Sequence, residues 1–189
     1  MNAALRSAPL PFFTIGHSTR SVDELIDLLQ GAQVRHLVDV RSMPRSRSNP
    51  QFNQDSLPDA LAKAQISYRH IAALGGLRGK SHEVPAEVNG NWRNQSFHNY
   101  ADYTLSEEFR AGLDELQTLG HDARTAFMCA EALWWRCHRR LIADQLLTRG
   151  EQVFHIMAEG QHDPAHLTPG AVIAPDGCLH YPSPQGQLL

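Results

Sequence analysis

Residues 11–47 read PFFTIGHSTRSVDELIDLLQGAQVRHLVDVRSMPRSR, and this stretch decides the fold class. Pro11–Ile15 is an apolar, β-rich run that predicts a strand. Ser21, with Glu24 three residues later, is typical of a capping box, and the helix that it opens is expected to end at Gly31. Val34–Val40 predicts a second strand. A strand–helix–strand order with polar loops after each strand predicts a parallel α/β sheet, which binds ligands at the carboxyl ends of its strands.

The rest of the chain continues this alternation of strands and helices. Thr104 is the expected cap of the helix over 105–119, with Glu107 completing a capping box. Further strands are predicted over 66–71, 125–129, 153–157 and 171–174, and further helices over 55–65 and 137–148. Residues 81–99 lack periodicity, which predicts a long lid or surface loop.

The 189 residues correspond to a single domain. We expect a flexible N-terminal arm over 1–11, one compact α/β domain with a mostly parallel sheet flanked by helices over 12–160, and a C-terminal extension over 161–189. A net charge of −3 argues against a globally basic nucleic-acid binder. The chain has no apolar run of the roughly 18 residues that a membrane helix needs, and residues 1–11 contain one arginine and no apolar h-region. We therefore expect no secretion, no membrane association and a cytoplasmic location.

Polar residues collect where the predicted strands end. Because parallel strands share one carboxyl edge, we expect these residues to converge on a single site. The candidate catalytic residues are His17, Asp39, Cys129 and Glu131. The candidate ligand-binding residues are Ser18, Arg20, Arg41, Arg45, Gly75, Gly76, Arg78, His138 and Arg139.

The start of the helix predicted over 137–148 carries an unusual charge pattern. Helix N-termini favour acidic residues, but Arg136, Arg139 and Arg140 crowd this end instead. An anionic ligand would compensate these charges, and so would Glu131 from within the chain. Residues 74–80, Leu-Gly-Gly-Leu-Arg-Gly-Lys, offer a second, weaker oxyanion cradle that does not match a nucleotide-binding P-loop.

The cysteines suggest three alternatives. Cys129 ends a predicted strand, so it is a thiol nucleophile or a small buried hydrophobe. The tyrosine-phosphatase C-x5-R pattern fails because Trp135 stands where the arginine is required. Zinc binding by Cys129, Cys137, His138 and His17 lacks a CxxC or HExxH spacing, so the sequence predicts no metal site and leaves the cofactor unknown.

Arginine replaces lysine almost throughout the chain. Only Lys63 and Lys80 are lysine among 17 basic residues. A genome rich in G and C would produce this bias, and so would recognition of oxyanions by bidentate guanidinium groups. The positions favour recognition for one group of arginines, which fall at the predicted carboxyl edge: Arg20, Arg41, Arg45, Arg78, Arg136 and Arg139. We therefore expect a local basic pocket.

Several short motifs, in this order, resemble the prokaryotic domain of unknown function 488 family. They are Phe13–Arg20 (FTIGHSTR), Val38–Arg41 (VDVR) with Pro44 and Arg45, Leu74-Gly75-Gly76, Cys129-Ala130-Glu131 and Cys137-His138-Arg139. The resemblance covers roughly residues 12–160. It departs at Trp134-Trp135-Arg136, where many members have a more polar loop. It implies a compact α/β domain and no established reaction.

Three functions compete. The first is an enzyme that acts on a phosphorylated or nucleic-acid substrate, with His17 shuttling a proton and Asp39 or Glu131 as base. The second is a non-catalytic module that binds nucleotide or nucleic acid, with Trp134-Trp135 as a stacking platform. The third is a structural or partner-binding domain in which arginine–carboxylate pairs merely fix the strand ends. The sequence leaves the oligomeric state open.

Overall fold

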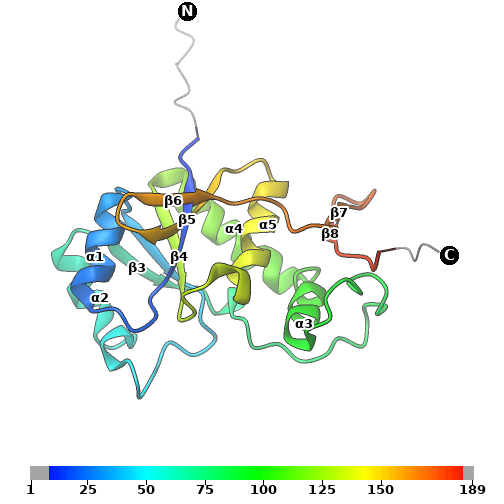
Figure 1. Ribbon diagram of the computed structural model, residues 1–189, viewed down its shortest axis with the longest axis horizontal. Coiled ribbons are helices and arrows are strands. Elements are labelled where there is room, and N and C mark those ends of the chain that lie inside the picture. The colour runs from blue at the N-terminus through cyan, green and yellow to red at the C-terminus, as the bar shows by residue number, and fades with distance from the viewer. Residues whose placement is uncertain (1–8, 185–189) are drawn as a thin grey trace, which may run out of the picture.

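Six strands form one sheet in the order β3-β2-β4-β1-β5-β6, in the computed structural model that describes residues 9–184 (Figure 1). The first five strands are parallel, and β6 pairs antiparallel to β5. The strands are β1 Phe12–Gly16, β2 His36–Asp39, β3 Ser67–His70, β4 Thr125–Cys129, β5 Val153–Ala158 and β6 Gln161–Pro164; a separate two-stranded sheet contains β7 Val172–Ile173 and β8 Leu179–His180. The α/β class and the mostly parallel sheet are confirmed.

Helices cover both faces of the sheet. Their bounds are α1 Val22–Gly31, α2 Leu57–Lys63, α3 Gln95–Tyr103, α4 Glu107–Asp122 and α5 Arg139–Thr148. From β1 to β3 the chain moves toward one edge of the sheet, and after β3 it turns back toward the other. Because crossovers between parallel strands are right-handed, this reversal places the two sets of helices on opposite faces.

Two apolar cores correspond to these two faces. Strand residues Phe13, Ile15 and Leu37 pack with α1 and α2. Their sequence neighbours Phe12 and Val38 point the other way, toward α3, α4 and α5. Since successive side chains in a strand alternate sides, one apolar run supplies both cores. The central strands are buried on both faces, which fixes the position of their carboxyl ends.

The start of α1 is as predicted. Ser21 Oγ accepts a hydrogen bond from the Glu24 amide, and the Glu24 carboxylate accepts one from the Ser21 amide. The predicted cap of α4 is wrong. Ser106 caps α4 by accepting from the Phe109 amide, whereas the Thr104 hydroxyl donates to the Ala101 carbonyl and closes α3.

The long loop expected over 81–99 is shorter than predicted. Residues 95–99 belong to α3, where Asn94 accepts hydrogen bonds from the amides of Ser96 and Phe97. The remainder of the loop is anchored by Asn89, which is buried and donates to Asp102. This segment therefore brings a helix against the sheet edge.

The chain after Gly160 packs onto the domain. β6 extends the main sheet, and Tyr181 is buried among residues of α3, α4 and α5. Most of the arm predicted over 1–11 and the last five residues of the predicted extension lie outside the described residues. Between residues 9 and 184, no helix is long and apolar enough to cross a bilayer.

Candidate functional site

A pocket of about 720 Å³ opens at the carboxyl ends of β1, β2 and β4. The loops after these strands, the loop after β3 and the beginnings of α3 and α5 all contribute to its wall. Its lining residues are His17, Ser18, Thr19, Arg41, Ser42, Met43, Asn49, Gly76, Leu77, Ser96, Phe97, Cys129, Ala130, Glu131, Ala132, Arg136, Cys137 and His138. Four predicted strand ends therefore meet at one pocket, which is where ligands bind in open α/β sheets.

The chemically reactive side chains of the pocket are two cysteines and a histidine. The His138 Nδ1 atom lies 3.7 Å from Cys137 Sγ and 3.9 Å from Cys129 Sγ. All three potential ligand atoms lie within 4.8 Å of one another. Cys129 ends β4 and Cys137 precedes α5, so the loop between them returns to bring the two sulfurs together.

The surrounding backbone fixes the orientation of His138. Its Nε2–H donates to the Val40 carbonyl at 2.9 Å, so the neutral ring has an unprotonated Nδ1 that faces the sulfurs. Gly76 makes room for this ring, because a Cβ at that position would lie 2.6 Å from Nδ1. The edge of the Tyr100 ring packs against the same imidazole at 5.0 Å between centroids. The imidazole is held from three sides.

Arg139 lies behind the cysteines and does not line the pocket. It is 1% exposed, and its guanidinium donates to the Glu131 carbonyl, to Thr14 Oγ1 and to Cys137 Sγ. A hydrogen bond from Cys129 and the positive charge of Arg139 hold the pKa of Cys137 well below its usual range, although burial acts in the opposite direction. The hydrogen bond to Cys137, together with burial, raises the pKa of Cys129. Arg139 thus supports the cysteines from inside the protein.

A second buried network ties β1 to β2. Arg41 forms a bidentate ion pair with Asp39, and its Nη1 donates to His17 Nε2 at 3.2 Å. Tyr68 donates its hydroxyl to the same carboxylate at 2.7 Å. Asp39 is fully buried and lies behind Arg41. Its carboxylate therefore holds a neighbouring arginine.

Both ring nitrogens of His17 make hydrogen bonds within the protein. Nδ1–H donates to the Ser18 carbonyl, and Nε2 accepts from Arg41. Burial lowers the pKa of His17 to about 4, and the charge of Arg41 acts in the same direction. The ring also stacks on Phe52 at 4.2 Å between centroids. His17 is therefore a neutral, fixed part of the pocket wall.

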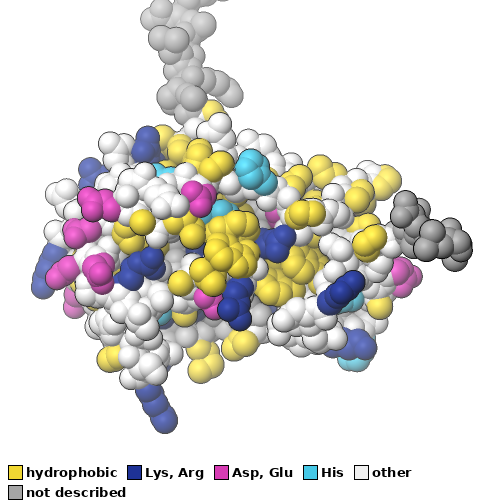
Figure 2. Space-filling view, viewed as in Figure 1, with side chains coloured by type: hydrophobic (Ala, Val, Ile, Leu, Met, Phe, Trp, Pro, Cys, Tyr) yellow, Lys and Arg dark blue, Asp and Glu magenta, His cyan; other side chains and the backbone are white. Residues whose placement is uncertain are grey.

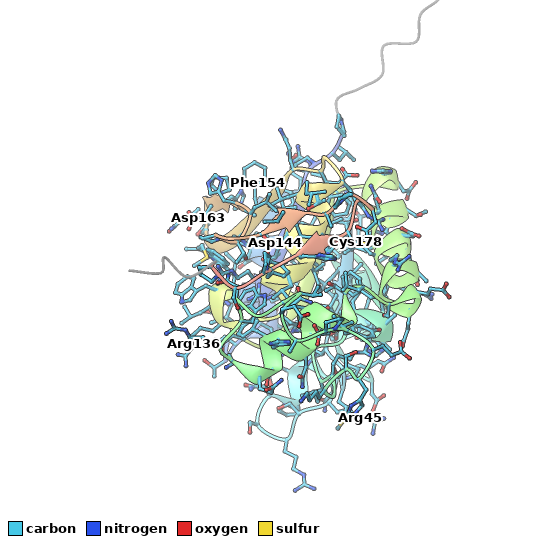
Figure 3. All side chains as sticks on the ribbon, turned by 90° about the vertical axis from the view of Figure 1, so that its right-hand side faces the viewer. Arg45, Arg136, Asp144, Phe154, Asp163 and Cys178 are labelled. Carbon is cyan, nitrogen blue, oxygen red and sulfur yellow. The ribbon has the colours of Figure 1, made fainter. Side chains whose placement is uncertain are left out.

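Besides Arg139, three more of the arginines predicted for the site do not line the pocket. Arg20 donates to the carbonyls of Gly16 and Met157. Arg78 lies 3.7 Å above the Tyr103 ring. Arg45 forms an ion pair with Asp55 in which its side chain is 71% exposed, and Figure 3 shows Arg45 far from Arg136.

The pocket rim carries one basic and one acidic side chain. Arg136 is exposed, and its side chain makes no hydrogen bond or ion pair within residues 9–184. Glu131 is also exposed and accepts a hydrogen bond from the Leu133 amide. Gly75 lies just outside the lining, where a Cβ would meet Ser42 Oγ at 2.6 Å.

The sequence did not predict several polar lining residues, although Arg136 on the rim belongs to the group of arginines expected at the carboxyl edge. Ser42 and Asn49 lie in the loop after β2, and Ser96 lies in the first turn of α3. Asn94 was the available signal for α3, because asparagine is a favoured N-cap. Trp134, considered above as a stacking platform, instead stacks on His155 at 4.2 Å and 5°.

These features define an open, doubly wound α/β protein with a cysteine–histidine pocket at the carboxyl edge of its sheet. The chain belongs to the family described as Domain of unknown function DUF488, whose model matches residues 21–146. This match confirms the family that the motifs resemble; the first motif, Phe13–Arg20, lies before the matched residues. No curated protein and no solved structure matches the chain.

Proposed function

We propose that this protein is an enzyme that binds a small oxyanionic molecule, such as a phosphorylated metabolite, in the 720 Å³ pocket. The observation that carries the proposal is Arg136 on the pocket rim beside the start of α5, whose side chain has no ion-pair partner among residues 9–184. The first turn of α5 contains no acidic residue, so the helix end adds its own partial positive charge. An anion in the pocket would meet both charges.

The shape of the site favours a small molecule over a nucleic acid. Pockets for small ligands have volumes of about 300–1,000 Å³, and this pocket falls in that range. Nucleic-acid binders present basic patches or stripes that follow the phosphate backbone. Figure 2 shows the basic side chains of one face scattered singly among acidic and apolar ones.

The contents of the pocket favour an enzyme over a passive binding module. Cys129, Cys137 and His138 all line it, and thiols and imidazoles are the side chains most often used as nucleophiles, acid–base groups and metal ligands. The Asp39–Arg41 pair, in contrast, supports the structural alternative for these two residues. Their polar atoms are used within the protein, so the proposal assigns them to holding the pocket wall.

Binding of inorganic phosphate, pyrophosphate and adenosine monophosphate, measured by NMR shift perturbation of the full chain, tests the proposal. We expect at least one probe to shift resonances of the pocket residues. Arg136→Gln should lower the affinity for that probe at least about tenfold, because a charge-assisted hydrogen bond contributes roughly 1.5–3 kcal/mol. Arg149→Gln is the matched control, since Arg149 pairs with Asp114 away from the pocket.

Two results would overturn the proposal. One is the absence of binding by all three probes. The other is equal weakening by Arg136→Gln and Arg149→Gln. A single-stranded oligonucleotide that binds with a steep loss of affinity in salt, and that phosphate does not displace, would replace the small molecule by a nucleic acid.

A further inference from the structure

The potential ligand atoms of Cys129, Cys137 and His138 lie within 4.8 Å of one another, and all three residues line the pocket. We propose that they form a metal site of the zinc type, with two thiolate sulfurs and His138 Nδ1 as ligands. The metal site does not depend on the anion proposed above. If both proposals hold, the bound anion would contact the metal ion. No CxxC or HExxH motif signals it, because seven residues separate the two cysteines.

The distances fit a tetrahedral ion. Zinc lies about 2.3 Å from thiolate sulfur and about 2.0–2.1 Å from histidine nitrogen, which places tetrahedral sulfur and nitrogen ligands roughly 3.5 Å apart. The two nitrogen–sulfur distances here are 3.7 and 3.9 Å. The two sulfurs lie within 4.8 Å of each other, so the three ligands would have to move closer together to complete the coordination.

The second observation is the way His138 is held. Histidines that bind metals usually donate their other ring N–H to a carbonyl or carboxylate, which fixes the tautomer and the ring orientation. Here Nε2–H donates to the Val40 carbonyl, and the free Nδ1 lone pair faces both sulfurs. The absence of a side chain at Gly76 leaves the space that this ring occupies.

Charge and protons balance on binding. Both cysteines bind the divalent ion as thiolates, and any proton that either sulfur carries before binding passes to solvent. Two thiolates neutralise the ion, and the N–H of Arg139 donates to one of the sulfurs at 3.4 Å. The buried guanidinium then supplies one net positive charge. Thiolate and imidazole ligands together favour zinc over magnesium or calcium, which prefer oxygen.

Three protein ligands leave a tetrahedral ion with one free position, which is the arrangement of catalytic rather than structural zinc. All three side chains line the pocket, so a small molecule reaches that position from the pocket. The ion would then act as a Lewis acid toward an oxygen of the bound anion. This role explains how the pocket can hold an anion although most of the predicted arginines lie elsewhere.

Cobalt(II) titration of the reduced, chelator-treated full chain tests the site. We expect one equivalent of cobalt to produce thiolate-to-cobalt charge-transfer absorption and the visible bands of tetrahedral cobalt, and zinc to abolish both. Cys129→Ser, Cys137→Ser and His138→Gln should each weaken or remove the signal. Cys178→Ser is the control and should leave it unchanged, because Cys178 lies in the β7–β8 segment away from the pocket.

Gly76→Ala tests the site without removing a ligand. The added methyl would displace the His138 ring, so we expect cobalt affinity to fall about 10–100-fold, as it does when groups that orient a ligand are lost. Gly79→Ala is the control, because a Cβ there meets nothing within 4 Å. This pair keeps the test valid if a cysteine variant fails to fold.

The inference is overturned if the reduced wild-type chain gives no thiolate-to-cobalt band, or if Cys178→Ser removes it. It is also overturned if Cys129 and Cys137 form a disulfide that persists in excess thiol reductant. If the cobalt bands form but none of the phosphate probes binds or changes them, the metal site is supported and the proposed anion is rejected. If phosphate binds in a way that depends on Arg136 but cobalt gives no signal, the proposed anion is supported and the metal site is rejected.

Discussion

Arg41 and Arg45 follow the same strand, but the structure uses them in opposite ways. Arg41 is 6% exposed and pairs with the fully buried Asp39. Arg45 pairs with Asp55 in solvent. When a buried ion pair loses one partner, the remaining charge stays desolvated without compensation, which destabilises the folded protein. When an exposed ion pair loses one partner, water solvates the remaining charge and the cost is small.

Arg41→Met should therefore lower the free energy of unfolding by about 3–5 kcal/mol, because it leaves the Asp39 carboxylate buried with only Tyr68 and backbone donors. Arg45→Met should change it by less than about 1 kcal/mol. Urea unfolding of both variants at neutral pH measures the difference. Equal effects would contradict a structural role for the Asp39–Arg41 pair.

His155 makes the stability of the protein depend on pH. The ring is buried, hydrogen-bonds to Thr14 and stacks on Trp134. Burial lowers its pKa from 6.5 to about 4, and the charge of Arg139 acts in the same direction. The neutral ring is favoured in the folded state, so its stabilising contribution is complete above pH 6.5 and is lost as the pH falls toward 4.

Between pH 7 and pH 5, the linkage relation gives a loss of about 2 kcal/mol from this one group. His155→Phe keeps an aromatic ring against Trp134 but cannot bind a proton. We expect its urea midpoint to fall less than that of the wild-type protein over the same pH interval. Parallel loss in the two proteins would show that His155 does not contribute and would leave His17, whose pKa is also lowered to about 4, as the buried histidine that titrates.

At the scale of elements, the end of β1 and the loop after β4 form one unit. The amides of His17 and Ser18 donate to the carbonyls of Cys129 and Ala130. Gly16 allows this close approach, because a Cβ there would lie 2.0 Å from the Glu131 carbonyl oxygen. The ends of the neighbouring strands β1 and β4 are therefore held together, and they form the side of the pocket that contains Cys129.

Gly16→Ala should force this loop away from β1 and lower stability by about 1–3 kcal/mol, the usual cost of overpacking. Gly31→Ala is a suitable control, because a Cβ at the end of α1 meets nothing within 4 Å. That variant should be neutral or more stable by up to about 1 kcal/mol, since alanine restricts the unfolded chain. Thermal unfolding separates the two, and a neutral Gly16→Ala would contradict the tight packing.

At the scale of the whole molecule, the segment after Gly160 is part of the core of one face. Tyr181 is fully buried and donates its hydroxyl to Asp144 of α5 at 2.9 Å. The Thr168 amide donates to the other oxygen of the same carboxylate. Asp144 is 1% exposed, so this carboxylate is buried. The segment therefore stabilises the helix that begins at the pocket.

Tyr181→Ala should lower the free energy of unfolding by about 3–5 kcal/mol through loss of a buried ring. Tyr181→Phe should lower it by about 1–3 kcal/mol, because only the hydrogen bond to Asp144 is lost. Val172→Ala, on the exposed strand β7, should have little effect. If all three variants unfold alike, the segment does not contribute to the core.

The sequence predicted the parts of this protein that depend on local patterning. Strand β4 has its predicted bounds, and the capping box at Ser21 is present because both of its partners lie within one turn. The convergence of strand ends followed from the rule that parallel strands share an edge. The order of the strands and the identity of each pocket neighbour depend on contacts between distant segments, which periodicity does not encode.

Only the tertiary structure shows which interaction each polar side chain makes. Arg41, Arg45 and Arg139 look equivalent in the sequence, yet one holds a carboxylate, one lies in solvent and one supports a cysteine. Cys129 and Cys137 meet at His138 because the loop after β4 returns to the sheet edge. The sequence by itself determined the α/β class and the edge of the sheet at which to look, because both follow from short-range apolar patterns. The chemistry at that edge depends on distances of a few ångströms between residues far apart in the chain, and folding alone sets those distances.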